Sequence, residues 1–137
     1  MSDLSGRCLC GRIKFSTPGP ILWSGICHCD SCRRATASPC TAFFGVTKDS
    51  IQWTGHPAVH ETSGGTVQRL YCKDCGTQIA YRADFWPDEN HFYMANLTNP
   101  EAVKPQAHYH WGEKLSWLAI NDDLPKYDTS SEAGDPL

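Results

Sequence analysis

Short runs of β-branched and aromatic residues alternate with turn-forming residues along most of the chain. Runs of this kind, bounded by glycine and proline, are typical of strands. The Pro-Gly-Pro at 18–20, the Gly-Gly at 64–65 and the Asn-Pro at 99–100 supply such boundaries. We therefore expect a mainly β fold with strands at 12–16, 21–26, 41–46, 51–54, 66–71, 78–82, 91–95 and 115–120.

One short helix interrupts this pattern, from residue 30 or 31 to residue 37. Asp30 or Ser31 could cap its first turn, and Pro39 follows directly after its expected end. The free N–H groups of a helix N-terminus favour negative charge and lower thiol pKa values. Any cysteine at this end would therefore be a reactive one.

Length and charge narrow the class of protein. The 137 residues fit a single domain spanning 1–137, with a polar and flexible tail from about 130 to 137. The formal net charge of -3 speaks against a nucleic-acid partner, which usually meets a basic surface. No apolar run approaches the roughly 18 residues of a membrane helix. We expect neither a nucleic-acid nor a membrane partner.

The chain contains eight cysteines, and seven of them lie in three short clusters. A disulfide scaffold is one explanation. The start of the sequence shows no apolar export signal, so we expect a cytoplasmic protein, in which thiols stay reduced. Cys-x-Cys and Cys-x-x-Cys spacings instead direct two thiolates at one tetrahedral metal, for which zinc is the usual occupant. The clusters are Cys8-x-Cys10, Cys27-x-Cys29-x-x-Cys32 and Cys72-x-x-Cys75.

Seven thiols divide naturally into four and three. Structural zinc is closed by four protein ligands, whereas catalytic zinc keeps three and leaves one position open. Cys10 and Cys75 are each followed by a glycine that permits a tight turn, so we expect two similar knuckles to form one clamp. This gives a four-cysteine site of Cys8, Cys10, Cys72 and Cys75, and a three-cysteine site of Cys27, Cys29 and Cys32.

The eighth thiol, Cys40, leaves this division open. It could complete the second site, which would then be closed and without catalysis. Alternatively it is a buried free thiol, the more common state of a single cysteine.

Three motifs and the end of the chain resemble the GFA family, the glutathione-dependent formaldehyde-activating enzymes, also called the centromere protein V/GFA group. The segment C-L-C-G at 8–11 is similar to the opening C-x-C-G of the family. C-H-C-D-S-C-R-R at 27–34 resembles C-H-C-x-x-C-R-R, and Y-C-K-D-C-G-T at 71–77 resembles F/Y-C-x-x-C-G-T. His108, Trp117 and D-L-P-K-Y at 123–127 are similar to the closing H…W…D-x-L-P-x-F/Y.

The resemblance implies an Mss4-like antiparallel β fold with two Zn²⁺ per chain. It assigns the four-cysteine site to a structural ion and the three-cysteine site to a catalytic ion. The implied reaction is of the carbon–sulfur lyase type: a thiol such as glutathione adds to a small aldehyde such as formaldehyde, as in S-(hydroxymethyl)glutathione synthase, or the reverse. A different class remains open, a zinc-stabilised binding module with two structural sites and no catalysis.

Individual residues near the three-cysteine site allow two interpretations each. His28 either packs away from the metal as a hydrogen-bonded neighbour or moves protons at the open position. Arg33 and Arg34 either form a solvated helix face or bind the carboxylates of a glutathione-like substrate. His108 and His110 would share one face of a strand, as a surface pair, as a pocket wall or as a source of a fourth zinc ligand.

Overall fold

The computed structural model describes residues 3–137, so Met1 and Ser2 of the expected domain lie outside the described residues. The chain forms two compact units, each built from two separate segments. Unit 1 contains residues 3–23 and Phe44–Val103; unit 2 contains Ser24–Phe43 and Lys104–Leu137. That residues 1–137 act as a single domain stays a prediction.

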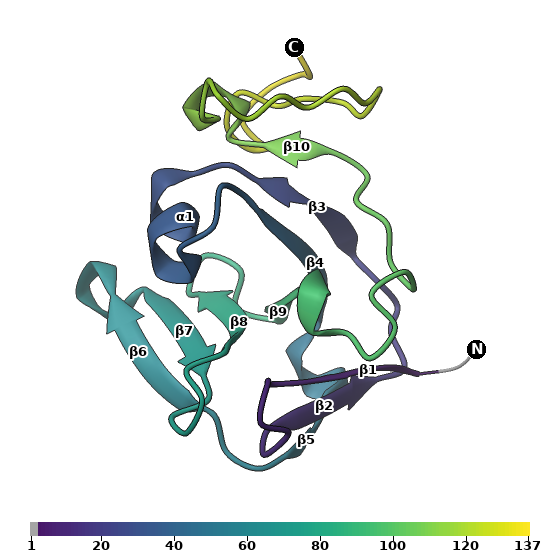
Figure 1. Ribbon diagram of the computed structural model, residues 1–137, viewed down its shortest axis with the longest axis vertical. Helices are drawn as coiled ribbons and strands as arrows, with labels where there is room; N and C mark the ends of the chain where they lie inside the picture. Colours follow the sequence, from purple (N-terminus) through teal and green to yellow (C-terminus); the bar gives the residue numbers. More distant parts are fainter. Residues whose placement is uncertain (1–2) are drawn as a thin grey trace. The chain divides into compact units, whose positions relative to one another are not determined.

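Strands make up most of the regular structure, as Figure 1 shows. The strands are β1 (Leu4–Arg7), β2 (Lys14–Thr17), β3 (Trp23–Cys27), β4 (Thr41–Thr47), β5 (Gln52–Thr54), β6 (Ala58–Thr62), β7 (Val67–Tyr71), β8 (Gln78–Ala83), β9 (Glu89–Tyr93) and β10 (His108–Tyr109). The α-helix α1 spans Asp30–Thr36, and short 3-10 turns occur at Lys48–Ser50, Ser63–Gly65, Met94–Asn96 and Trp111–Glu113. The mainly β fold class is confirmed.

Unit 1 holds two antiparallel arrangements of strands. One is a three-stranded sheet in the order β1-β2-β5. In the other, β9, β8, β7 and β6 follow one another, with β4 beside β9. Phe15 and Phe92 stack with ring centroids 3.8 Å apart, and Phe44 and Phe92 are fully buried. These aromatic rings form the core against which the strands of unit 1 pack.

In unit 2 the strand β10 runs parallel to β3. His108 lies opposite Ile26 and Tyr109 lies opposite Cys27. The backbone N–H of His108 donates to the carbonyl of Pro125, and the N–H of Tyr127 donates back to His108 at 2.9 Å. The C-terminal segment is thus tied to β10, and β10 is tied to the strand that ends at Cys27.

Seven of the eight expected strands are present, with ends shifted by a few residues. The expected strand at 115–120 is wrong. Residues 116–117 form a turn, in which the N–H of Leu118 donates to the carbonyl of Leu115 at 3.1 Å. The ammonium group of Lys114 also donates to the carbonyls of Leu115 and Leu118, at 2.9 and 2.6 Å. This local hydrogen bonding holds the backbone in a turn rather than in a sheet.

The helix α1 begins as expected, but its cap is different. Neither Asp30 nor Ser31 caps it; the N-cap is Cys29, whose sulfur accepts the backbone N–H of Cys32 at 3.3 Å. The helix ends at Ala37, which adopts the left-handed conformation with φ 52°. A cysteine of the three-cysteine motif thus caps the helix.

Acid is expected to destabilise unit 1 through His91. This ring is buried, its Nε2 lies 2.9 Å from a Glu89 oxygen, and Trp23 packs edge-on against it. Burial lowers the pKa of His91, although Glu89 opposes the shift. Because the unfolded chain then binds the proton more tightly, this stability is complete above about pH 6.5 and decreases as the pH falls below it.

Urea unfolding between pH 7.5 and 5 would measure this effect. H91Q should lose less stability over that range than the wild type, whereas the exposed-histidine control H60Q should follow the wild type. Equal slopes for H91Q and H60Q would contradict the assignment to His91.

Candidate active site

The four expected structural ligands come together in unit 1. The sulfur atoms of Cys8, Cys10, Cys72 and Cys75 all lie within 4.8 Å of one another, and the thiols are free. The sulfurs of Cys8 and Cys10 are 3.6 Å apart, and those of Cys10 and Cys72 are 3.8 Å apart. A tetrahedron with Zn–S bonds near 2.3 Å places its sulfurs about 3.8 Å apart. The donor set therefore fits one tetrahedral thiolate-bound ion.

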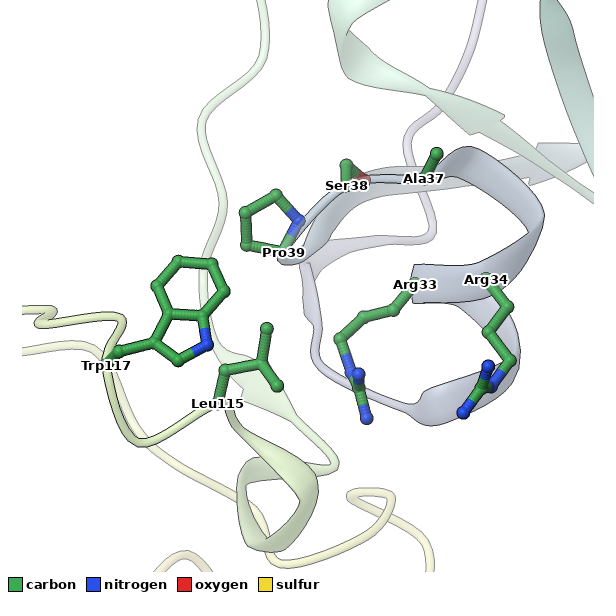
Figure 2. A pocket seen from close by; sticks show the side chains of 7 residues that line it. All are labelled: Arg33, Arg34, Ala37, Ser38, Pro39, Leu115 and Trp117. Carbon is green, nitrogen blue, oxygen red and sulfur yellow. The ribbon is translucent and has the colours of Figure 1, made fainter.

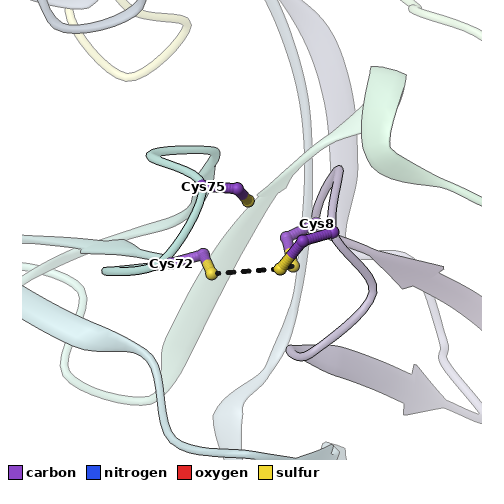
Figure 3. Close-up of side chains that lie close together, drawn as sticks. Cys8, Cys72 and Cys75 are labelled. Atoms are coloured by element: carbon purple, nitrogen blue, oxygen red, sulfur yellow. Dashed lines mark hydrogen bonds between the residues drawn. The ribbon is translucent and has the colours of Figure 1, made fainter.

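Two tight turns present these thiols, as Figure 3 shows for Cys8 and for the Cys72–Cys75 loop. Gly11 and Gly76 have φ values of 80° and 79°, in the left-handed region that favours glycine. The Gly76 N–H donates to the Cys72 carbonyl at 2.7 Å and closes the second turn. The hydroxyl of Thr77 accepts the Leu9 N–H at 3.0 Å, so the two turns are linked directly.

Within this cluster, hydrogen bonding favours the thiolate form of Cys75. The Thr77 hydroxyl, 3.2 Å from the Cys75 sulfur, and the backbone N–H groups of Cys10 and Thr77 lower the pKa of Cys75 to about 5. A thiolate, not a thiol, is the metal ligand. The loop around Cys75 thus favours the form of the side chain that binds a cation.

The three-cysteine site is also assembled, within unit 2. The sulfurs of Cys27, Cys29 and Cys32 lie within 4.8 Å of one another. Cys27 ends β3, Cys29 caps α1, and Cys32 is buried in the first turn of that helix. Three elements of local structure within six residues therefore direct the three thiols at one point.

Among these three thiols, the negative charge concentrates on Cys29. Hydrogen bonds from the Cys27 and Cys32 thiols lower the pKa of Cys29 to about 2, and the Cys32 backbone N–H adds to the shift. The same sharing raises the pKa of Cys27, since its proton is held by the hydrogen bond to Cys29. The cluster thus carries one thiolate readily and fits a cation that would ionise the others.

Cys40 does not belong to this cluster in the part of the chain that the structure describes. It is a free, half-buried thiol, and burial raises its pKa. The three-cysteine site therefore keeps three thiol donors. The possibility that Cys40 completes it, left open by the sequence, finds no support in the geometry.

His28, between two of these cysteines, is fully buried and turns to a histidine neighbour. Its Nε2 lies 2.9 Å from Nδ1 of His108, which is also fully buried. Burial, followed by the neighbouring His108, lowers the pKa of His28 to about 4. His108 in turn lies 2.8 Å from a carboxylate oxygen of Asp122. The expectation that His108 and His110 share a strand face is wrong, since β10 ends at Tyr109 and His110 adopts φ 54°.

A cavity of about 370 Å³ lies beside α1 in unit 2. Figure 2 shows the side chains of Arg33 and Arg34 extending in the same direction from the helix, with Pro39, Leu115 and Trp117 nearby. Trp117 is 69% exposed, unusual for so large an apolar side chain. The cavity combines guanidinium donors with apolar walls, as a small organic acid would require.

Both arginines also contact the first residue of the helix. Nε of Arg34 lies 2.9 Å from an Asp30 oxygen, and a guanidinium nitrogen of Arg33 lies 3.5 Å from the same oxygen. Nε of Arg33 donates to the carbonyl of His28 at 3.3 Å. The Arg33 side chain is 21% exposed and the Arg34 side chain is 78% exposed, so Arg34 is the more available of the two for a ligand.

The sequence of the chain is also similar to that of a known protein family. The sequence model of the family described as glutathione-dependent formaldehyde-activating enzyme, GFA, matches residues 3–113. The chain belongs to the GFA family. The matched range contains all seven clustered cysteines together with His28, Arg33 and Arg34, whereas Asp122 lies beyond it.

Two individual proteins are similar to this GFA chain, one in sequence and one in fold. It is 30% identical over 81 residues to a protein of Schizosaccharomyces pombe named an uncharacterized lyase; the alignment spans 59% of this chain and 58% of the relative. A crystal structure of a Rhodobacter sphaeroides protein superposes with a TM-score of 0.57 at 19% identity, covering 74% of this chain and 91% of the other. The first likeness concerns part of each protein, and the second concerns the fold.

The sequence did not reveal several residues around the three-cysteine site. Asp122 and Glu113 approach it from the C-terminal segment: Glu113 accepts the Asp30 N–H at 3.2 Å and lies 3.2 Å from Nδ1 of His110. Leu115 and Trp117 were expected in a strand and instead line the cavity.

Among the described residues, no helix is both long and apolar enough to cross a membrane.

Proposed function

We propose that this GFA-family protein is a zinc-dependent carbon–sulfur lyase-type enzyme that adds a glutathione-like thiol to a small aldehyde such as formaldehyde, or reverses that addition. Two Zn²⁺ per chain are part of the proposal. Cys8, Cys10, Cys72 and Cys75 would hold the structural ion, and Cys27, Cys29 and Cys32 would hold the catalytic one. The observation that carries the proposal is the cluster of three thiols, which has no fourth member among the described residues and lies at the start of the helix whose Arg33 and Arg34 line a cavity.

The proposed reaction is the addition of a thiol to an aldehyde, and it requires neither an oxidant nor a reductant. A carbon–sulfur bond forms between the thiol sulfur and the aldehyde carbon, and the thiol proton ends on the former carbonyl oxygen. The reverse breaks the same bond. Zn²⁺ bound by three thiolates supplies two kinds of chemistry, a lowered pKa for a bound thiol and polarisation of a carbonyl oxygen.

The residues of the chain would select and orient the thiol substrate. Glutathione carries two carboxylates, and guanidinium groups bind carboxylates through paired hydrogen bonds. Arg34 would offer its exposed guanidinium, and Arg33, more deeply placed, would keep the helix in contact with the His28 carbonyl while facing the same cavity. Leu115 and Trp117 would cover the apolar part of the bound molecule. His28 remains a candidate for holding or moving a proton at this site.

A binding module with two closed zinc sites is the competing function. It needs a fourth protein ligand at the second site, which the sequence could supply from Cys40 or a histidine, and neither joins the three thiols among the described residues. The geometry thus supports the enzyme over the module.

Native mass spectrometry of freshly reduced, zinc-loaded protein would test the proposal. Two zincs per chain, with a glutathione adduct that is absent from C29S, would support an open site. Consumption of formaldehyde and glutathione, followed by NMR, would then establish turnover. A single zinc, or two zincs without any thiol adduct and without turnover, would contradict it.

Replacing Arg34 is expected to weaken binding of the acidic thiol selectively. R34Q should raise KM for glutathione by up to about 5-fold, a modest factor because water screens so exposed a charge. KM for 2-mercaptoethanol, which lacks carboxylates, should not change. R12Q is the matched control, since the Arg12 side chain is 72% exposed and pairs with Asp74 in unit 1. Equal effects of R34Q on both thiols would exclude Arg34 from carboxylate recognition.

A further inference from the structure

Three side chains of unit 2 form a continuous hydrogen-bonded series, of which the proposed function involves only His28. Asp122 Oδ2 lies 2.8 Å from Nε2 of His108, and Nδ1 of His108 lies 2.9 Å from Nε2 of His28. Both histidines are fully buried. Trp111 packs edge-on against both rings, with centroid distances of 5.3 and 4.9 Å. The series therefore runs from a partly exposed carboxylate to the loop that carries the three cysteines.

The positions of the ring protons follow from these contacts. An ionised carboxylate can only accept, so Nε2 of His108 must carry the proton that it donates to Asp122. A neutral His108 then has a bare Nδ1, which can only accept. His28 must donate to it from Nε2, and this leaves Nδ1 of His28 without a proton. The structure agrees in one respect: Nδ1 of His28 is buried and has no hydrogen-bond partner among the described residues.

Asp122 itself is held in a fixed orientation. Its other oxygen, Oδ1, accepts the backbone N–H of Leu124 at 3.1 Å and lies 3.6 Å from the ammonium group of Lys126. With Oδ1 engaged in this way, Oδ2 is directed at His108. The hydrogen bond to His108, followed by these contacts with Leu124 and Lys126, lowers the pKa of Asp122, consistent with an ionised carboxylate at neutral pH.

The backbone of His28 is fixed at the same point. Its N–H donates to the Tyr109 carbonyl at 3.0 Å, and its carbonyl accepts Nε of Arg33 at 3.3 Å. The ring is the third attachment of this residue. Since His28 stands between Cys27 and Cys29, movement of its ring would move the two thiols on either side of it.

We propose that Asp122 is a positioning residue: through His108 it holds His28 in the Nε2-protonated tautomer and thereby fixes the loop of Cys27 and Cys29. The part that concerns the tautomer stands independently of the proposed function. The consequence for the metal rests on the zinc assignment made there. In this role Asp122 touches neither substrate nor metal, and it acts from 14 residues beyond His108.

The test uses D122N, which keeps the size of the side chain and replaces a pure acceptor by a group that can donate. The introduced amide would donate its N–H to Nε2 of His108, which would shift the His108 proton to Nδ1 and force His28 to its other tautomer. Long-range ¹H–¹⁵N NMR of the histidine rings at neutral pH distinguishes protonated from bare ring nitrogens. The matched control is D123N, a change at an adjacent, exposed aspartate.

In the wild type and in D123N we expect protons on Nε2 of both His28 and His108, and in D122N on Nδ1 of both. Tautomers unchanged in D122N would overturn the proposal. A doubly protonated His108 in the wild type would also overturn it, because His28 would then have to accept at Nε2. Circular dichroism of D122N with a wild-type melting midpoint would show that the fold is intact.

A second readout concerns the metal alone. Competition for Zn²⁺ between the protein and a chromophoric chelator measures the affinity of each site. In D122N we expect the Zn²⁺ affinity of the weaker of the two sites to fall about 10–100-fold, the usual effect of removing a residue that orients a metal ligand. The tighter site in D122N, and both sites in D123N, should keep wild-type affinity. Two unaltered affinities would restrict Asp122 to the histidines and overturn its role in fixing the cysteine loop. Failure of turnover in all proteins, with the tautomer switch present, would refute the proposed function and not this inference.

Discussion

C29S is expected to lower the turnover of glutathione with formaldehyde by about 100-fold or more, while the protein stays folded. Cys29 is the thiol on which the negative charge of the three-cysteine site concentrates, with a pKa lowered to about 2. A serine hydroxyl does not ionise at neutral pH and is a poor ligand for zinc. The chemistry of the site should therefore be lost with this one sulfur.

The fold should survive C29S for a local reason. Cys29 is the N-cap of α1, and its sulfur accepts the N–H of Cys32. Serine is among the preferred N-cap residues, so its oxygen can accept the same N–H. C40S is the matched control, because Cys40 is a free thiol outside the cluster. Initial rates and melting midpoints of the three proteins decide the matter; a fully active C29S would end the enzymatic proposal.

C72S is expected to have the opposite profile, a loss of folding rather than of chemistry alone. Cys72 is fully buried in the four-cysteine cluster, where its sulfur lies 3.8 Å from that of Cys10. Structural zinc contributes about 10–16 kcal/mol in small zinc-binding domains. That is comparable to the roughly 5–15 kcal/mol by which whole domains are stable. Without the site, unit 1 should unfold at room temperature or close to it.

Thermal unfolding followed by circular dichroism would show this loss for C72S and for wild-type protein treated with a zinc chelator. C40S removes a half-buried thiol that belongs to neither cluster, and it should melt close to the wild type. Should C72S melt together with C40S, the four-cysteine cluster would not be a structural metal site.

Much of the fold was predictable because strand signals here are local. Residues 41–46 and 78–82 carry dense β-branched and aromatic residues, and both are strands within one residue of their predicted ends. The three strands that were missed lack that signal: β1 has no β-branched or aromatic residue, β6 has largely exposed residues, and β10 consists of only His108 and Tyr109. The wrong strand at 115–120 contains Trp117, whose apolar ring faces a cavity instead of a core. Apolar residues of a binding surface and of a strand look alike in a sequence.

The division of the cysteines was predictable because metal coordination limits the count of ligands. Groups of four and three thiols were expected, and within each group the sulfur atoms lie close together. The hydrogen-bonded series of His28, His108 and Asp122 was not predictable in this way. Its first two members are 80 residues apart, and no spacing rule connects a histidine in a cysteine motif with one in a distant strand. Such pairings arise from strand register, here that of β10 along β3.

The two cysteine clusters also differ in how much chain must be made before either can form. Cys27, Cys29 and Cys32 lie within six residues, so this loop is complete as soon as that stretch leaves the ribosome. The other cluster has to wait for Cys75, and a long segment must close before its four thiols meet. Since chains are synthesised from the N-terminus, the two cysteine clusters are completed in a fixed order, with the three-thiol loop first. During synthesis, the three thiols of the proposed catalytic centre are thus available to metal ions before the four-cysteine cluster can assemble.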